Sequence, residues 1–243
     1  MHSPRPQSHR ILFWGDSLTE GFPGVAYIHK LQKWHPHWEL VNLGRGGDTI
    51  LSIQKRLENS SETGDIAVFW AGVNDVFADI VPGYALLKTV LRQKPTKNLN
   101  SFLSHYSQCL DLLLEQCQHV LTIPPLFLGE HPKNPYNLRL SEMGERIQRI
   151  TEKKPQCSFL RIHDYLPLKE EEASPFLPTN PLPRVAESLE KNLCDSDYDQ
   201  AAERRGLQWT YDGVHLNSAG AVTVAQAFSE ALTTLVKSPS LRL

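Results

Sequence analysis

The chain has 243 residues, of which 40% are hydrophobic and 21% charged, a composition typical of globular proteins. Its 25 Lys and Arg against 27 Asp and Glu give a net charge of −2, so no basic excess indicates nucleic acid or an anionic membrane as partner. A chain this long can bury a core of its own, which excludes disorder as the main state and fits one domain over residues 1–243.

Metal sites, leader sequences and membrane spans find no support in the sequence. The four cysteines form no Cys-x-x-Cys pair and the histidines show no ligand spacing, so we expect no metal and no other cofactor. Residues 1–10 are polar and lack the apolar segment of a signal peptide. No apolar run approaches the roughly 20 residues of a membrane helix. We therefore expect a cytoplasmic protein with reduced thiols and no stable membrane anchor.

Short apolar runs alternate with longer segments along the chain. The runs predicted to be strands are residues 11–14, 39–43, 66–70, 120–123 and 158–162. Continuous apolar runs of this kind are typical of strands that are buried on both faces of a parallel sheet.

The intervening segments carry apolar residues at helical spacing. The predicted helices cover residues 50–57, 99–117, 140–150 and 221–235, the last with Asn217 or Ser218 as its N-cap. This alternation predicts a three-layer α/β/α sandwich around a doubly wound parallel sheet of about five strands.

Two long stretches, residues 76–98 and 166–206, exceed what a minimal α/β unit needs, and the second contains a predicted helix over residues 184–193. Both follow the carboxyl ends of predicted strands, where open α/β folds bind ligands. They are either walls of a substrate site or insertions without a role.

The first chemical motif is GDSLTEG at residues 15–21, directly after the first predicted strand. A serine at this place, Ser17, is either the N-cap of the next helix or a nucleophile. The second motif is YDGVHLN at residues 211–217. Its Asp-x-x-His spacing lets Asp212 and His215 project to one side, where the aspartate can fix the tautomer of a histidine base. Each motif alone is also compatible with a structural turn.

Two further segments contain candidate hydrogen-bond donors. Residues 42–49 (NLGRGGDT) follow the second strand, and their glycines leave backbone N–H groups available for a ligand. Asn74 follows the third strand and could donate its side-chain amide to a developing oxyanion. The alternatives are a tight turn for the first segment and an Asx-turn for the second.

Taken together, the order Ser, Gly, Asn and Asp-x-x-His resembles the SGNH hydrolase family, also called GDSL esterases and lipases, over nearly the whole chain. The family implies a flavodoxin-like fold. It also implies that Ser17 is the nucleophile, His215 the base and Asp212 the residue that orients it. The oxyanion donors would be the Ser17 N–H, the Gly47 N–H and the Asn74 amide, with Gly44 and Gly46 competing for the role of Gly47.

The resemblance predicts hydrolysis of a small-molecule acyl ester through an acyl-enzyme, without a cofactor. Asp16 is expected to hold its loop rather than to transfer a proton. The same machinery could serve a thioesterase, a lysophospholipase or a carbohydrate O-deacetylase, and a non-catalytic binding protein is a further alternative. Aromatic residues that flank the motifs could line the pocket or belong to the core: Trp14, Phe22, Trp70, Phe77 and Tyr211.

Overall fold

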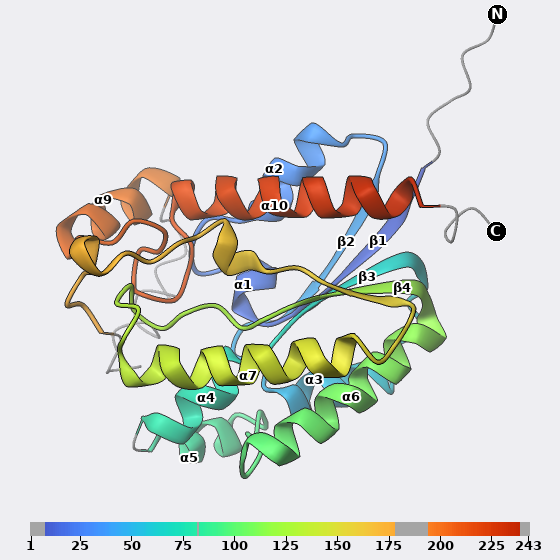
Figure 1. The fold of residues 1–243 in the computed structure, drawn as a ribbon, viewed down its shortest axis with the longest axis horizontal. Coiled ribbons are helices and arrows are strands. Elements are labelled where there is room, and N and C mark those ends of the chain that lie inside the picture. Colours follow the sequence, from blue (N-terminus) through green and yellow to red (C-terminus); the bar gives the residue numbers. More distant parts are fainter. Residues whose placement is uncertain (1–7, 82, 178–193, 239–243) are drawn as a thin grey trace, which may run out of the picture.

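The computed structural model describes residues 8–81, 83–177 and 194–238. In these residues five parallel strands form one sheet, in the order β2-β1-β3-β4-β5 (Figure 1). The strands are β1 (Arg10–Gly15), β2 (Glu39–Gly44), β3 (Gly64–Trp70), β4 (Cys117–Ile123) and β5 (Cys157–Phe159). The strand order is that of a flavodoxin-like sheet, which confirms the predicted doubly wound fold.

Helices cover both faces of the sheet (Figure 1). One layer contains α2 (Tyr27–Trp34) and α10 (Ser218–Val236), which pack on each other. The other contains α3 (Ile50–Leu57), α6 (Leu99–Gln116) and α7 (Pro135–Thr151). The shorter helices are α1 (Ser17–Glu20), α4 (Val73–Ile80), α5 (Tyr84–Val90), α9 (Asp195–Arg205), η1 (Ile162–Asp164) and η2 (Glu170–Glu172). The predicted helix over 184–193 lies outside the described residues.

The core explains the continuous apolar runs. Central strand β1 is buried on both faces, and an aromatic cluster joins it to the α2 and α10 layer. The edge of Tyr27 meets the ring of Phe228 at 5.0 Å between centroids, and Trp70 lies 6.0 Å from Tyr27. Trp14 and Trp70 are buried, so they belong to the core rather than to a pocket.

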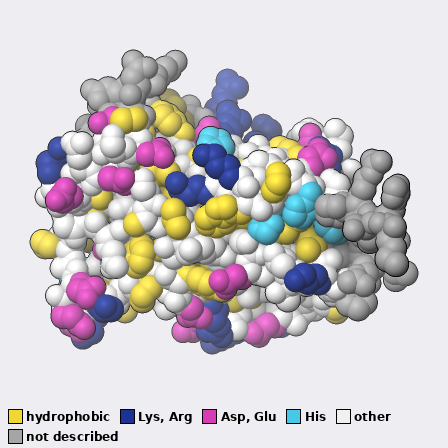
Figure 2. Space-filling view, turned by 90° about the horizontal axis from the view of Figure 1, so that it is seen from above, with side chains coloured by type: hydrophobic (Ala, Val, Ile, Leu, Met, Phe, Trp, Pro, Cys, Tyr) yellow, Lys and Arg dark blue, Asp and Glu magenta, His cyan; other side chains and the backbone are white. Residues whose placement is uncertain are grey.

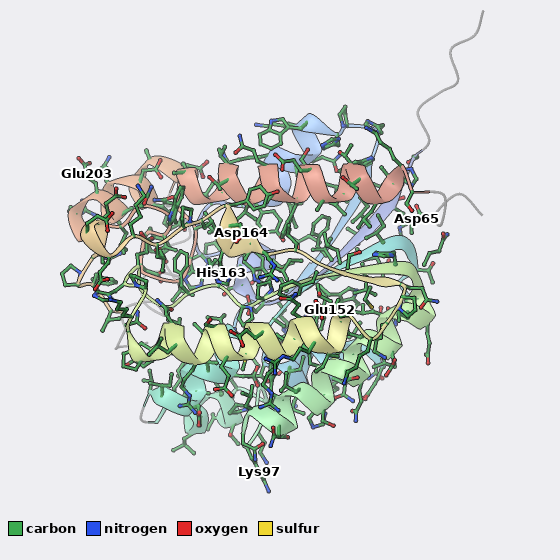
Figure 3. The ribbon with its side chains drawn as sticks, viewed as in Figure 1. Asp65, Lys97, Glu152, His163, Asp164 and Glu203 are labelled. Carbon is green, nitrogen blue, oxygen red and sulfur yellow. The ribbon has the colours of Figure 1, made fainter. Side chains whose placement is uncertain are left out.

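The sequence misplaced two element boundaries. Cys117, expected at the end of a helix, begins β4 and pairs with Gly64 of β3. The fifth strand ends at Phe159 because Ile162 folds back to bond the carbonyl of Leu160, which starts η1. Residues His163 and Asp164, predicted to follow a strand directly, therefore lie on this short turn (Figure 3).

Helix α10 is long and apolar enough to cross a membrane by length and composition alone. The expectation that no segment approaches this length is therefore wrong. In the structure its apolar stripe, which includes Val224, Phe228 and Leu232, is fully buried against the sheet and α2. Core packing thus accounts for its composition. Figure 2 shows acidic and basic side chains interspersed on this side of the molecule, rather than a field of one sign.

Candidate active site

The site lies where the strand order reverses. Strand β1 runs between β2 and β3, so the segments that follow these three strands meet at the carboxyl edge of the sheet. Ser17 begins α1 just after β1, residues 45–49 follow β2, and Asn74 lies on the first turn of α4 after β3. His215 reaches the same place from the loop before α10.

A continuous chain of hydrogen bonds joins the serine, the histidine and the aspartate. Ser17 Oγ lies 3.0 Å from His215 Nε2, and His215 Nδ1 lies 2.9 Å from Asp212 Oδ2. The other oxygen of Asp212 accepts the backbone N–H groups of Val214 and His215, at 3.0 and 2.8 Å. The aspartate thus fixes both the imidazole ring and the loop that carries it.

Ser17 does not cap its helix. Asp16 is the N-cap, because its Oδ1 accepts the N–H of Leu18 at 3.0 Å. The Ser17 hydroxyl is consequently directed to His215. Its backbone N–H, on the first turn of α1, donates to no group in the described part of the chain.

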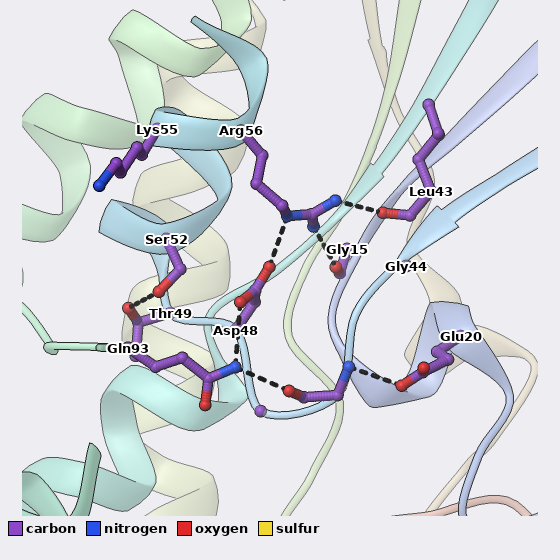
Figure 4. Close-up of polar contacts among 12 residues, drawn as sticks. Gly15, Glu20, Leu43, Gly44, Asp48, Thr49, Ser52, Lys55, Arg56 and Gln93 are labelled. Carbon is purple, nitrogen blue, oxygen red and sulfur yellow. Dashed lines mark hydrogen bonds and ion pairs between the residues drawn. The ribbon is translucent and has the colours of Figure 1, made fainter. Parts of the chain in front are cut away.

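The geometry of the glycine-rich loop favours Gly47 over its neighbours as a donor. Gly44 N–H donates to Asn42 Oδ1 at 2.9 Å. Gly46 N–H donates to Glu20 Oε2 at 2.6 Å, the contact drawn at the Glu20 carboxylate in Figure 4. Gly47 N–H donates to nothing within residues 8–81, 83–177 and 194–238. Gly47 has φ +74°, a region that suits glycine, and a Cβ there would lie 2.2 Å from Lys88 Nζ.

Asn74 makes long-range contacts rather than an Asx-turn. Its Nδ2 donates to Asp16 Oδ2 at 3.2 Å and to the carbonyl of Asp48 at 3.1 Å. Its Oδ1 accepts the hydroxyl of Tyr84 at 3.2 Å. Asp16 thus holds the amide beside Ser17, in line with the expectation that it orders the loop.

The hydroxyl and the donors open into a cavity of about 310 Å³. Its polar lining includes Ser17, Gly47, Asn74 and His215. Its walls are mainly apolar and are formed by Phe22, Phe77, Tyr84, Leu87, Leu91, Leu128 and Val214. Residues 76–98 contribute α5, and with it part of this wall. Tyr211 is buried beside His215 instead of lining the cavity.

Sequence reasoning missed how the loop of His215 is held. The buried carboxylate of Glu130 accepts the backbone N–H groups of Gln208, Trp209 and Thr210 at 2.6–2.9 Å, together with the Thr210 hydroxyl. The neighbouring Gly129 N–H bonds the carbonyl of Gly213. The turn after β4 therefore anchors the backbone on both sides of Asp212. Its only sequence signal is a lone acidic residue after an apolar run.

The family model of GDSL-like lipases and acylhydrolases matches residues 13–222 of this chain. The chain belongs to this family. Membership makes the GDSL-like protein an ester hydrolase that acts on small-molecule esters. A comparison with curated proteins finds no match.

Solved structures share the fold of this GDSL-like hydrolase at low sequence identity. Axe2, an acetylxylan esterase from Geobacillus stearothermophilus, is 17% identical with a TM-score of 0.61, covering 91% of this chain and 93% of its own. The acetyl xylan esterase AlAXEase is 21% identical with a TM-score of 0.62, covering 92% and 99%. An alpha/beta hydrolase from the metagenome of Lake Arreo, Spain, is 17% identical with a TM-score of 0.63, covering 93% and 96%.

Buried charges surround the site of the GDSL-like hydrolase. Burial raises the pKa of Asp16 to about 6 and that of Asp75 to about 7. Burial also raises the pKa of Asp48. The ion pair that Asp48 forms with Arg56 at 2.7 Å partly offsets this rise (Figure 4). Burial lowers the pKa of Lys88 to about 8, although the nearby carboxylates oppose this shift. No cluster of three or more His, Cys, Asp or Glu suited to a metal occurs in the described ranges.

The raised pKa of Asp75 should make stability depend on pH. Its carboxylate caps α3 through the Ile50 N–H at 2.9 Å, but ionisation costs more in the folded state than in the unfolded chain. Its contribution to stability is therefore full in acid and is lost as the pH rises through 7. Asp75→Asn removes this loss, so the free energy of unfolding of the variant should gain about 2–3 kcal/mol relative to wild type between pH 5 and 8. Urea titrations at both pH values measure the gain, and parallel pH dependences would contradict it.

Proposed function

We propose that this protein is a serine carboxylic ester hydrolase that acts through an acyl-enzyme on Ser17. The observation that carries the proposal is the hydrogen-bonded chain from Ser17 through His215 to Asp212, with the serine facing a cavity of its own. Serine is a weak nucleophile until a base takes its proton, and this chain supplies the base and the group that orients it.

In the first half of the reaction, His215 Nε2 takes the hydroxyl proton as Ser17 Oγ attacks the ester carbonyl carbon. Negative charge develops on the carbonyl oxygen, beside the N–H groups of Ser17 and Gly47 and the Asn74 amide. The tetrahedral intermediate then collapses, and His215 protonates the departing alcohol. In the second half, water attacks the acyl-enzyme with His215 again as base, and the acid is released.

Replacement of Asn74 by alanine should lower kcat about 10²–10³-fold, the usual effect of losing one oxyanion donor. An oxyanion would compete with the Asp48 carbonyl and Asp16 Oδ2 for the N–H groups of Asn74 Nδ2, which now lie 3.1–3.2 Å from these two acceptors. KM and the far-UV circular dichroism should stay near wild type. Steady-state kinetics on a p-nitrophenyl ester decide the matter, and an unchanged kcat would remove Asn74 from the mechanism.

Two observations suggest different acyl groups for the substrate. The apolar wall formed by Phe77, Leu87, Leu91 and their neighbours favours an acyl chain longer than acetyl. Two of the structural neighbours are described as acetylxylan esterases, which makes a carbohydrate O-deacetylase the second candidate. Both reactions use the same chemistry at Ser17.

The test is hydrolysis of p-nitrophenyl esters from acetyl to decanoyl, with acetylated xylo-oligosaccharide as a separate substrate and Ser17→Ala as control. We expect wild type to cleave esters and the variant not to. A maximum at medium chain length would support the apolar acyl site. A maximum at acetyl, with release of acetate from the sugar, would support the deacetylase. Absence of hydrolysis on every substrate would favour a non-catalytic binding protein.

A further inference from the structure

The segment formed by α5 and the turn after it lies against the loop that carries Gly47. This segment, residues 84–93, falls in one of the two long stretches that the sequence left open as either a wall of the site or an insertion without a role. Three of its side chains reach back to the candidate oxyanion donors: Tyr84, Lys88 and Gln93. Tyr84 donates its hydroxyl to Asn74 Oδ1, and the other two contact the loop itself.

Gln93 holds the peptide that ends in the Gly47 N–H. Its Nε2 donates to the carbonyl of Gly46 at 2.8 Å and to Asp48 Oδ1 at 3.1 Å (Figure 4). The carbonyl and the N–H of a trans peptide point in opposite directions. A donor on the Gly46 carbonyl therefore directs the Gly47 N–H away from Gln93 and also polarises it, which strengthens it as a donor.

Lys88 holds the next peptide. Its buried ammonium donates to the carbonyl of Gly47 at 2.5 Å and to Gln93 Oε1 at 3.0 Å, and it lies 5.1 Å from the centre of the Tyr84 ring. The ammonium already has these partners within the protein, so Lys88 is better suited to holding the loop than to binding an anionic substrate.

The backbone brings these two side chains together at some conformational cost. Gln93 N–H bonds the carbonyl of Lys88 at 2.8 Å, which closes the turn after α5. The turn passes through Arg92 at φ +60°, a left-handed conformation that is uncommon for residues other than glycine. A residue in such a conformation is typical of positions where the surrounding structure fixes the geometry of a site.

We propose that Lys88 and Gln93 are positioning residues that fix the Gly47 N–H as an oxyanion donor. Both residues line the cavity beside Gly47, and they act on the Gly47 N–H through the two peptides on either side of it. This inference rests on the proposed serine mechanism, because a fixed donor matters only where an oxyanion forms. It gives residues 84–93 a role in catalysis besides that of walling the cavity.

The experiment compares Lys88→Met, Gln93→Glu and the control Lys97→Met, an exposed lysine of the same stretch whose side chain points away from the molecule (Figure 3). Lys88→Met keeps the length of the side chain but loses both hydrogen bonds. Gln93→Glu keeps the acceptor for Lys88 but loses the donor to Gly46. Three quantities are measured: kcat, KM, and the rate of inactivation by a p-nitrophenyl alkylphosphonate. In the last reaction Ser17 Oγ displaces p-nitrophenolate from phosphorus, and the phosphoryl oxygen takes the place of the oxyanion.

We expect kcat and the inactivation rate to fall together by about 10–100-fold in both variants, with KM within about threefold of wild type, since the loss of a whole donor costs about 10²–10³. Lys97→Met should match wild type. If both rates stay within about threefold of wild type, or only KM rises, the two residues merely support the wall and the proposal is wrong. Should Lys88→Met fail to fold, Gln93→Glu decides alone. Wild-type-like hydrolysis by Ser17→Ala would instead overturn the serine mechanism itself.

Discussion

Replacement of Ser17 by alanine is expected to lower kcat for p-nitrophenyl esters by about 10⁴–10⁶-fold. The variant loses the atom on which we propose that the acyl-enzyme forms, and His215 Nε2 loses the hydroxyl that lies 3.0 Å away. The remaining donors can still bind a carbonyl, so KM should change little. Mass spectrometry after treatment with the phosphonate should show one adduct on wild type and none on the variant.

Ser52→Ala is a suitable control for this experiment. Ser52 lies on α3 and bonds the Thr49 hydroxyl at 3.1 Å, near the glycine-rich loop but without contact to His215. Its kinetics should be those of wild type. Retention of a tenth or more of the activity in purified Ser17→Ala would show that another group is the nucleophile.

Replacement of Asp212 by asparagine should lower kcat by about 10³–10⁴-fold without unfolding the loop. The amide oxygen can still accept the N–H groups of Val214 and His215. Its NH₂ group would then face His215 Nδ1 and keep that nitrogen unprotonated. The proton would sit on Nε2, which could no longer accept the proton of Ser17.

The matched control is Asp199→Asn. Asp199 Oδ1 accepts the N–H of Ser218 at 2.8 Å, so it also holds backbone at the start of α10 but orients no histidine. The control should keep wild-type kcat, as measured on the same ester. An Asp212→Asn variant with a third or more of wild-type kcat would show that the ring needs no carboxylate to orient it.

The sheet was largely predictable from sequence because strands buried on both faces leave continuous apolar runs. The bounds of α3 were predicted from the spacing of Ile50, Ile53 and Leu57 alone, and all three side chains are buried. Helices α4 and α5 were not predicted. Helix α4 does show a helical period, because residues 73, 76, 77 and 80 are apolar, but from the sequence this segment is interpreted as a turn and the start of a long connection. Helix α5 has only seven residues. The short β5 ended early because only three of its residues pair with β4.

The candidate site likewise contains residues that could be predicted from the sequence and residues that could not. Ser17, Asn74 and His215 follow strands or precede a helix in motifs with fixed spacing, and the structure brings them together. The residues that hold them had no such spacing. Lys88 looks like a surface lysine in a leucine-rich helix, and Glu130 like a charge in a turn. Their roles depend on backbone carbonyls and N–H groups of distant loops, which a sequence pattern does not encode.

The separation of Ser17 from His215 along the chain has a consequence in time. The two residues are 198 positions apart, so the ribosome adds the histidine roughly 10–40 s after the serine at ordinary elongation rates. During that interval the nascent polypeptide contains Ser17 but not the histidine that we propose as its base, so under the proposed mechanism ester cleavage cannot start. The appearance of hydrolysis during synthesis would therefore report when the last loop docks on the finished sheet. Translation arrested before residue 215 should yield chains that contain the GDSL motif but do not hydrolyse the ester.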